Sequence, residues 1–147
     1  MSITGQCRCA AVTYQLDLPA LPAIYACHCR HCQRWSGSAF GLHALVPEAA
    51  LRITGEVLEY LHEHEGQQSR QLLCASCHGR ICNSTTAAPG MQVLRAGTLD
   101  DGAKLVPAAH IWVSRKQPWL VLPEAVPCWE QSPEPMEFAG AVFGLSL

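Results

Sequence analysis

Hydrophobic and polar residues alternate in short stretches along most of the chain. The clearest stretch, residues 11–16, carries Val12, Tyr14 and Leu16 on one side and polar residues opposite, which indicates a strand with one buried face. Further short runs rich in apolar or β-branched residues, bounded by Gly, Pro or Asp, are predicted to be strands: residues 38–46, 56–64, 69–74, 91–99 and 109–113. Many short strands without the spacing of βαβ units predict a mainly antiparallel β domain.

Helices are predicted to be few. Only residues 30–35 and residues 47–51 have the pattern of a short helical turn. Ten prolines, dense after residue 118, predict an extended rather than helical C-terminal stretch, because proline interrupts helices. No repeat or linker is visible, so residues 1–147 are expected to form a single domain, and a chain of this length can bury an ordinary core.

Composition and charge exclude several classes of partner. Hydrophobic residues make up 49% of the chain and charged residues 15%, which indicates a globular rather than a disordered protein. A net charge of -2 without a lysine or arginine run predicts neither a nucleic-acid nor an anionic-membrane partner. No signal peptide or spanning segment is visible, so we expect a cytoplasmic protein with reduced thiols.

The nine cysteines change this picture, because seven of them stand in tight groups. Tetrahedral zinc needs its sulfurs about 3.8 Å apart, and both a C-x2-C turn and an extended C-x-C segment supply that spacing. Disulfides between next-but-one neighbours would be strained, so metal binding is favoured over disulfides. The groups are Cys7 with Cys9, Cys27 with Cys29 and Cys32, and Cys74 with Cys77, whereas Cys82 and Cys128 stand apart.

Seven clustered thiols suit one closed site with four ligands and one open site with three. A structural zinc site has four protein ligands, whereas a catalytic site has three and keeps a position for water or substrate. The natural partition joins the two pairs into the closed site and leaves the triplet as the open one. Spacing alone leaves the pairing open, because Cys82, His28, His31 or His78 could complete a fourth vertex. The usual spacings of an iron–sulfur cluster are absent.

Six segments, in their order along the chain, resemble the glutathione-dependent formaldehyde-activating enzyme family, which shares a superfamily with centromere protein V. They are GQCRCAAVTY, CHCRHCQRWSGSAFGLHALVP, CASCHG, LRAGTLDD, HIWVSRKQPW and PCWEQSP, spanning Gly5 to Pro133. The resemblance implies a zinc-bearing β-tent fold of small antiparallel sheets. It also implies two zinc ions per chain, a structural one held by Cys7, Cys9, Cys74 and Cys77 and a catalytic one held by Cys27, Cys29 and Cys32.

The same resemblance implies an activity. Such an enzyme is a carbon–sulfur lyase that condenses glutathione with formaldehyde to S-(hydroxymethyl)glutathione. Either the thiol is activated at the open position or the aldehyde oxygen is polarised there, and the negative charge of three thiolates favours the first route slightly. A glutathione carrier without catalysis and a zinc-stabilised binding module are the alternatives.

Two residues depart from the family's pattern, and one of them is Leu73, which precedes Cys74 where an aromatic residue is common. Glycine usually follows the second cysteine of the C-x2-C pair, whereas here His78 precedes Gly79. Glycine suits this place because a zinc knuckle commonly needs a positive φ. His78 therefore predicts a distorted knuckle or an imidazole near the metal.

The remaining conspicuous residues have simpler interpretations. His28 and His31 are expected to shape the loop between cysteines, with ligand or proton-shuttle roles open. Arg34 is expected to be a solvated residue, with a glutathione carboxylate as its alternative partner. Packing in the core or at its rim is predicted for Trp35, Trp112, Trp119 and Trp129. Residues 62–65 are predicted to form a solvated strand face, and residues 99–102 a turn. Cys82 and Cys128 are predicted to be small buried side chains.

Overall fold

The computed structural model describes residues 2–144, which divide into two compact units. The first unit combines residues 2–22 with residues 44–104, and the second combines residues 23–43 with residues 105–144. Among the described residues are ten strands and two α-helices, so the fold is mainly β, as the sequence predicts. None of the helices within residues 2–144 has the length and apolar character needed to cross a membrane.

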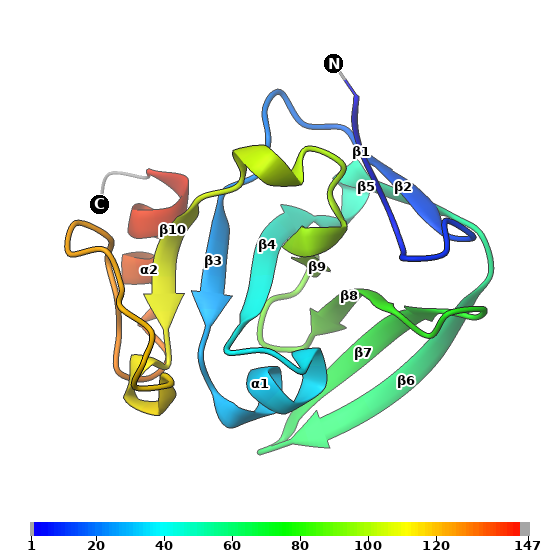
Figure 1. The fold of residues 1–147 in the computed structure, drawn as a ribbon. Helices are drawn as coiled ribbons and strands as arrows, with labels where there is room; N and C mark the ends of the chain where they lie inside the picture. The colour runs from blue at the N-terminus through cyan, green and yellow to red at the C-terminus, as the bar shows by residue number, and fades with distance from the viewer. Residues whose placement is uncertain (1, 145–147) are drawn as a thin grey trace. The chain divides into compact units, whose positions relative to one another are not determined.

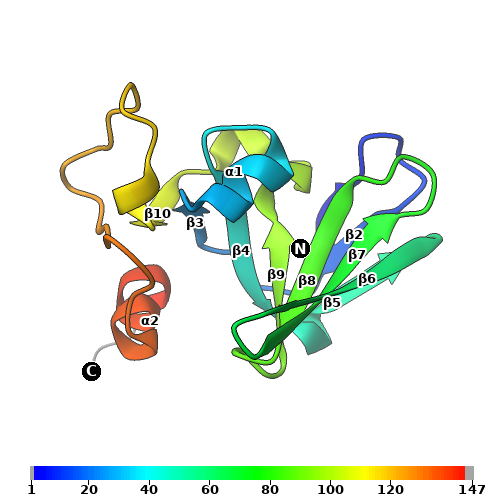
Figure 2. The same ribbon diagram turned by 90° about the horizontal axis from the view of Figure 1, so that it is seen from below.

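The first unit is built from antiparallel strands. Three of them form a sheet in the order β1–β2–β5, and the others follow the order β4–β9–β8–β7–β6 (Figure 1). Figure 2 shows β6, β7 and β8 side by side as a twisted ribbon. Their bounds are β1 Ile3–Gln6, β2 Thr13–Leu16, β4 Gly41–Pro47 (its last four residues lie in this unit), β5 Leu51–Thr54, β6 Val57–His64, β7 Gln67–Cys74, β8 Arg80–Thr85 and β9 Met91–Arg95.

The strand predicted at residues 11–16 is confirmed: it corresponds to β2, with Val12 directly before it. Val12 and Leu16 are fully buried, and Tyr14 is 2% exposed. The Tyr14 hydroxyl forms a 2.8 Å hydrogen bond with Thr98 Oγ1, and burial raises the pKa of Tyr14 to about 12. A Cβ at Gly5 would lie 2.2 Å from the Tyr14 ring, so the crossing of β1 over this ring requires glycine.

The second unit holds a pair of strands that differs from the antiparallel expectation. β3 (Ile24–Cys27) pairs in parallel with β10 (Pro107–Ile111). Parallel strands need a long crossover, and most of the chain separates these two. Tyr25 contacts Phe138 edge to face at 4.9 Å between ring centroids, which packs the C-terminal helix against this pair.

The two predicted helical turns are present, but the structure has further helical segments that the sequence did not predict: 3₁₀ turns at Ala96–Thr98, Gly102–Lys104 and Val113–Arg115, and a second α-helix. α1 (Arg30–Ser36) and a 3₁₀ turn at Glu48–Ala50 confirm the two predicted helical turns. α2 (Pro135–Phe143) corrects the prediction of an extended C-terminal stretch. Proline is compatible with this helix because Pro135 occupies its first turn, where a backbone N–H is not needed.

Candidate metal centres

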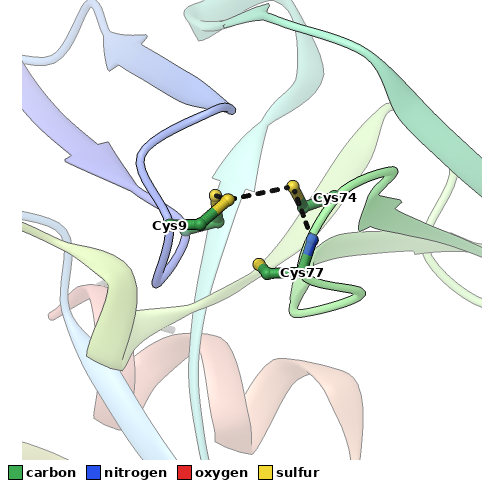
Figure 3. Close-up of side chains that lie close together, drawn as sticks. Cys9, Cys74 and Cys77 are labelled. Atoms are coloured by element: carbon green, nitrogen blue, oxygen red, sulfur yellow. Dashed lines mark hydrogen bonds between the residues drawn. The ribbon is translucent and has the colours of Figure 1, made fainter.

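Four cysteines from two separate segments meet in the first unit, here called the four-cysteine cluster. Cys7 and Cys9 lie in the loop after β1, Cys74 ends β7, and Cys77 lies in the turn before β8. Figure 3 shows the Cys9 sulfur facing Cys74, with Cys77 on the same turn as Cys74. All four sulfurs lie within 4.8 Å of one another.

The spacing of these sulfurs fits a tetrahedral ion. The Cys7 and Cys9 sulfurs are 3.6 Å apart, and those of Cys9 and Cys74 are 3.7 Å apart. Ligands at a zinc–sulfur distance of about 2.3 Å are separated by about 3.8 Å in a tetrahedron. A disulfide bond, by contrast, is about 2.05 Å long. The cluster therefore fits a zinc ion and contains no disulfide.

Backbone N–H groups prepare this cluster to carry negative charge. Cys74 Sγ accepts hydrogen bonds from the backbone N–H groups of Ser76 at 3.3 Å and Cys77 at 3.4 Å. Cys7 Sγ accepts one from Val12 at 3.4 Å. The backbone hydrogen bond from Gly79 lowers the pKa of Cys77 to about 6. Donors aimed at sulfur favour the thiolate, which is the form that binds metal.

His78 adopts the left-handed backbone conformation for which the family's pattern has glycine. Its φ is 60°, and its backbone N–H donates to the Cys74 carbonyl at 2.9 Å. The turn thus closes with a non-glycine residue in a region that costs such residues about 1–2 kcal/mol. The side chain of His78 is exposed and does not join the four-cysteine cluster.

Replacing His78 with glycine is expected to raise the free energy of unfolding by about 1 kcal/mol, because glycine adopts a positive φ without the Cβ penalty. Urea unfolding of the zinc-loaded protein measures the change. His78→Ala is the matched control, since it removes the imidazole and keeps the Cβ, and we expect it to give no gain. An equal gain from alanine would assign the strain to the imidazole rather than to the backbone.

Three cysteines meet in the second unit, here called the three-cysteine cluster. Cys27 ends β3, Cys29 is the N-cap of α1, and Cys32 lies in the first turn of that helix. Their sulfurs lie within 4.8 Å of one another. Cys27 is buried, whereas Cys29 and Cys32 are only partly buried. With three sulfurs and partial exposure, this cluster could hold an ion and leave one coordination position for another ligand.

Negative charge in this cluster concentrates on one sulfur. Hydrogen bonds from the Cys27 and Cys32 thiols lower the pKa of Cys29 to about 2, and the same interactions raise the pKa of Cys27. Cys29 Sγ also accepts the backbone N–H of Cys32 at 3.4 Å. On the other side, Cys32 Sγ lies 3.5 Å from His43 Nε2. A divalent cation would replace the protons that these sulfurs share.

Two buried histidines lie behind the cluster. His28 is fully buried and His110 is 6% exposed, and His28 Nε2 lies 2.9 Å from His110 Nδ1. Burial lowers the pKa of His28 to about 4 and also lowers that of His110, which keeps both rings neutral near pH 7. The side chain of His28 packs on Phe40, with ring centroids 5.3 Å apart. The interpretation of His28 as a shaping residue agrees with this geometry.

Gln33 is a site residue that sequence reasoning missed. Its side-chain amide donates to the carbonyls of His28 at 2.7 Å and Arg115 at 2.9 Å. Its oxygen accepts from Arg30 Nη1 at 2.5 Å and from Gln117 Nε2 at 3.3 Å. Gln33 thus fixes α1, which carries Cys32, to two other segments of the unit. A single glutamine between Cys32 and Arg34 gives no signal of this role in the sequence.

The two isolated cysteines differ from each other. Cys82 is fully buried, as predicted, and burial raises its pKa to about 11. Cys128 is exposed, which corrects the prediction of a buried side chain. It lies in an irregular stretch that forms an isolated bridge with His110 of β10 rather than a strand of its own, so no alternating strand pattern turns it inward. Neither cysteine belongs to a cluster.

Other predicted features lie outside the two clusters. The turn at residues 99–102 is confirmed, and the Thr4 hydroxyl donates to its Asp100 carboxylate at 2.6 Å. The run at residues 62–65 ends β6 and is largely solvated, as predicted. Arg34 is exposed, as predicted. Core or rim packing was predicted for the tryptophans: Trp112 and Trp129 are partly buried, whereas Trp35 and Trp119 are exposed.

Comparisons with known proteins agree with the cysteine pattern. The family model for the glutathione-dependent formaldehyde-activating enzyme matches residues 2–115, a range that contains both clusters. Among solved structures, a Rhodobacter sphaeroides protein known from a crystal structure has a TM-score of 0.55 and 18% identity, covering 71% of this chain and 97% of its own. That likeness concerns the fold alone. No curated protein matches the sequence.

Proposed function

Because the chain belongs to the glutathione-dependent formaldehyde-activating enzyme family, we propose that it is a zinc-dependent carbon–sulfur lyase. Its reaction would join glutathione to formaldehyde, giving S-(hydroxymethyl)glutathione. The observation that carries this proposal is the three-cysteine cluster, which offers three sulfurs instead of four and is partly exposed. A closed structural site has no such position for a substrate.

The donor atoms support zinc as the metal. Both clusters offer only cysteine sulfur, and soft thiolate ligands select zinc over magnesium or calcium. We propose that Cys7, Cys9, Cys74 and Cys77 hold a structural ion and that Cys27, Cys29 and Cys32 hold a catalytic one. When bound in the second site, zinc would supply a Lewis acid able to keep a thiol deprotonated near neutral pH.

The protein's own residues would position the reaction. Cys27, Cys29 and Cys32 would all bind the ion as thiolates, and Gln33 holds the helix that carries Cys32. His28, which lies between Cys27 and Cys29 in the chain, pairs with His110, and both rings stay neutral and add no charge. In the reaction, the thiol sulfur attacks the aldehyde carbon, one carbon–sulfur bond forms, and the thiol proton passes to the former carbonyl oxygen. Cleavage of the adduct reverses these steps.

Two-dimensional exchange NMR of formaldehyde with glutathione tests the proposal. We expect exchange cross-peaks to grow faster with the protein than in protein-free buffer, where adduct forms spontaneously. Cys128→Ser is the control, because an exposed thiol can itself react with formaldehyde, and this variant should exchange as fast as wild type. Exchange at the background rate with glutathione still bound would contradict catalysis and indicate a carrier.

A further inference from the structure

The hollow beside α1 carries a concentration of positive charge that neither metal cluster explains. It has a volume of about 350 Å³ and is lined by residues of α1 and its flanks, including Arg30, Gln33, Arg34, Ser38 and Gln117. All of these residues belong to the second unit. We infer that this hollow binds a carboxylate of the thiol substrate and thereby selects anionic thiols, an inference that rests on the proposed function.

The charges of the hollow are not balanced from within. Arg30 and Arg34 are four residues apart on α1, where like charges destabilise a helix. No lining residue is acidic, and the first turn of α1 contains no acidic residue. Within residues 2–144, neither arginine forms an ion pair. An anion entering the hollow would relieve this repulsion and would meet guanidinium groups, which bind carboxylates well.

One of the two arginines is already oriented. Arg30 Nη1 donates to Gln33 Oε1 at 2.5 Å, and Gln33 is itself buried and held by the carbonyls of His28 and Arg115. Gln117 completes the contact through its amide, 3.3 Å from the same oxygen. A guanidinium that is fixed before binding loses less conformational entropy when an anion arrives. Arg30 is therefore held in place by a buried hydrogen-bond network before an anion binds, unlike a mobile arginine on the surface.

The hollow and the three-cysteine cluster share one helix. Cys29 is the N-cap directly before Arg30, whereas Cys32 lies about 160° around the helix axis from Arg30 and from Arg34, so the sulfur of Cys32 and the two arginines lie on different faces of α1. With side chains, an α-helix is about 10–12 Å across, which limits the span between the two faces. A thiol that uses both places needs a carboxylate several bonds from its sulfur, as a short peptide thiol has. A small neutral thiol could reach the cluster but would leave the arginines without an anion.

Binding of S-methylglutathione, which has no thiol, tests this inference by calorimetry. We expect the double variant Arg30→Gln/Arg34→Gln to bind it at least about tenfold more weakly than wild type, a difference of about 1.4 kcal/mol. The diethyl ester of the same compound should bind both proteins equally weakly. The control Arg52→Gln/Lys104→Gln removes two exposed positive charges from the first unit and should bind like wild type.

The outcomes separate this inference from the proposed function. Equal affinity of wild type and the Arg30/Arg34 variant, equal affinity for acid and ester, or no binding to wild type would overturn the carboxylate site. Because the probe cannot react, these results do not depend on catalysis. Arginine-dependent binding without formaldehyde exchange would contradict the lyase alone, whereas exchange with arginine-independent binding would contradict the hollow alone.

Discussion

Replacing Cys74 with serine is expected to unfold the first unit and to remove its zinc ion. Cys74 is fully buried, and its sulfur meets that of Cys9, which lies 65 positions away in the chain. Structural zinc binding contributes about 10–16 kcal/mol to the folding of zinc-finger peptides. The free energy of unfolding of a typical domain is about 5–15 kcal/mol, so losing the ion can be enough to unfold the unit. Circular dichroism and metal analysis of the purified variant measure both effects.

Cys82→Ser is the matched control for this loss. Cys82 is also a fully buried cysteine of the first unit, but its sulfur belongs to neither cluster. Burying a hydroxyl there should cost about 1–3 kcal/mol and leave the zinc content unchanged. If the Cys74 and Cys82 variants lost the same stability and kept the same zinc, the four-cysteine cluster would have no structural role.

Replacing Cys29 with serine is expected to leave a folded protein that has one zinc ion fewer and no formaldehyde exchange above background. The cluster would keep only the sulfurs of Cys27 and Cys32, which are too few to hold the ion. The first unit keeps its own four cysteines, so its fold should persist. Exchange NMR, circular dichroism and metal analysis report on the three expectations.

The contrast between the two variants decides whether the clusters differ in role. Cys74→Ser should lose its fold, and Cys29→Ser should lose its activity while staying folded. If both variants unfolded, or if both stayed folded and inactive, the division into a structural and a catalytic centre would be wrong.

The cysteine groups could be read from the sequence because short spacing limits geometry. In a C-x-C or C-x2-C pair, the local backbone alone can bring the two sulfurs together, without contacts from distant segments. The structure joins the pair at residues 7 and 9 with the pair at residues 74 and 77, as the partition by ligand number predicts. Spacing alone left other fourth ligands open, since their exclusion depends on contacts between distant segments.

The features that sequence reasoning missed depend on tertiary contacts. The Gln33 side chain donates to the backbone carbonyls of the nearby His28 and the distant Arg115. Every residue has a backbone carbonyl, so the sequence does not indicate which carbonyls the fold will bring to Gln33. The parallel pairing of β3 with β10 has no local signature either. The helix α2 was obscured by proline density, although Pro135 at its start is compatible with helix.

His78 shows the limit of reasoning from a pattern alone. The departure from glycine predicted a distorted knuckle or an imidazole near the metal. The backbone instead keeps the left-handed φ with histidine in place, and the exposed side chain joins no cysteine group. The conformation is thus kept by the surrounding hydrogen bonds rather than by the residue's own preference.

Absorption spectroscopy of the cobalt-substituted protein tests most directly whether one centre is closed and the other open. Cobalt(II) takes tetrahedral thiolate sites and, unlike zinc, absorbs visible light with a spectrum that depends on its ligands. With two ions bound per chain, we expect glutathione to change the spectrum of one ion only and to change nothing in Cys29→Ser. A wild-type spectrum that does not respond to glutathione, or a response that persists in Cys29→Ser, would contradict an open substrate position at the three-cysteine cluster.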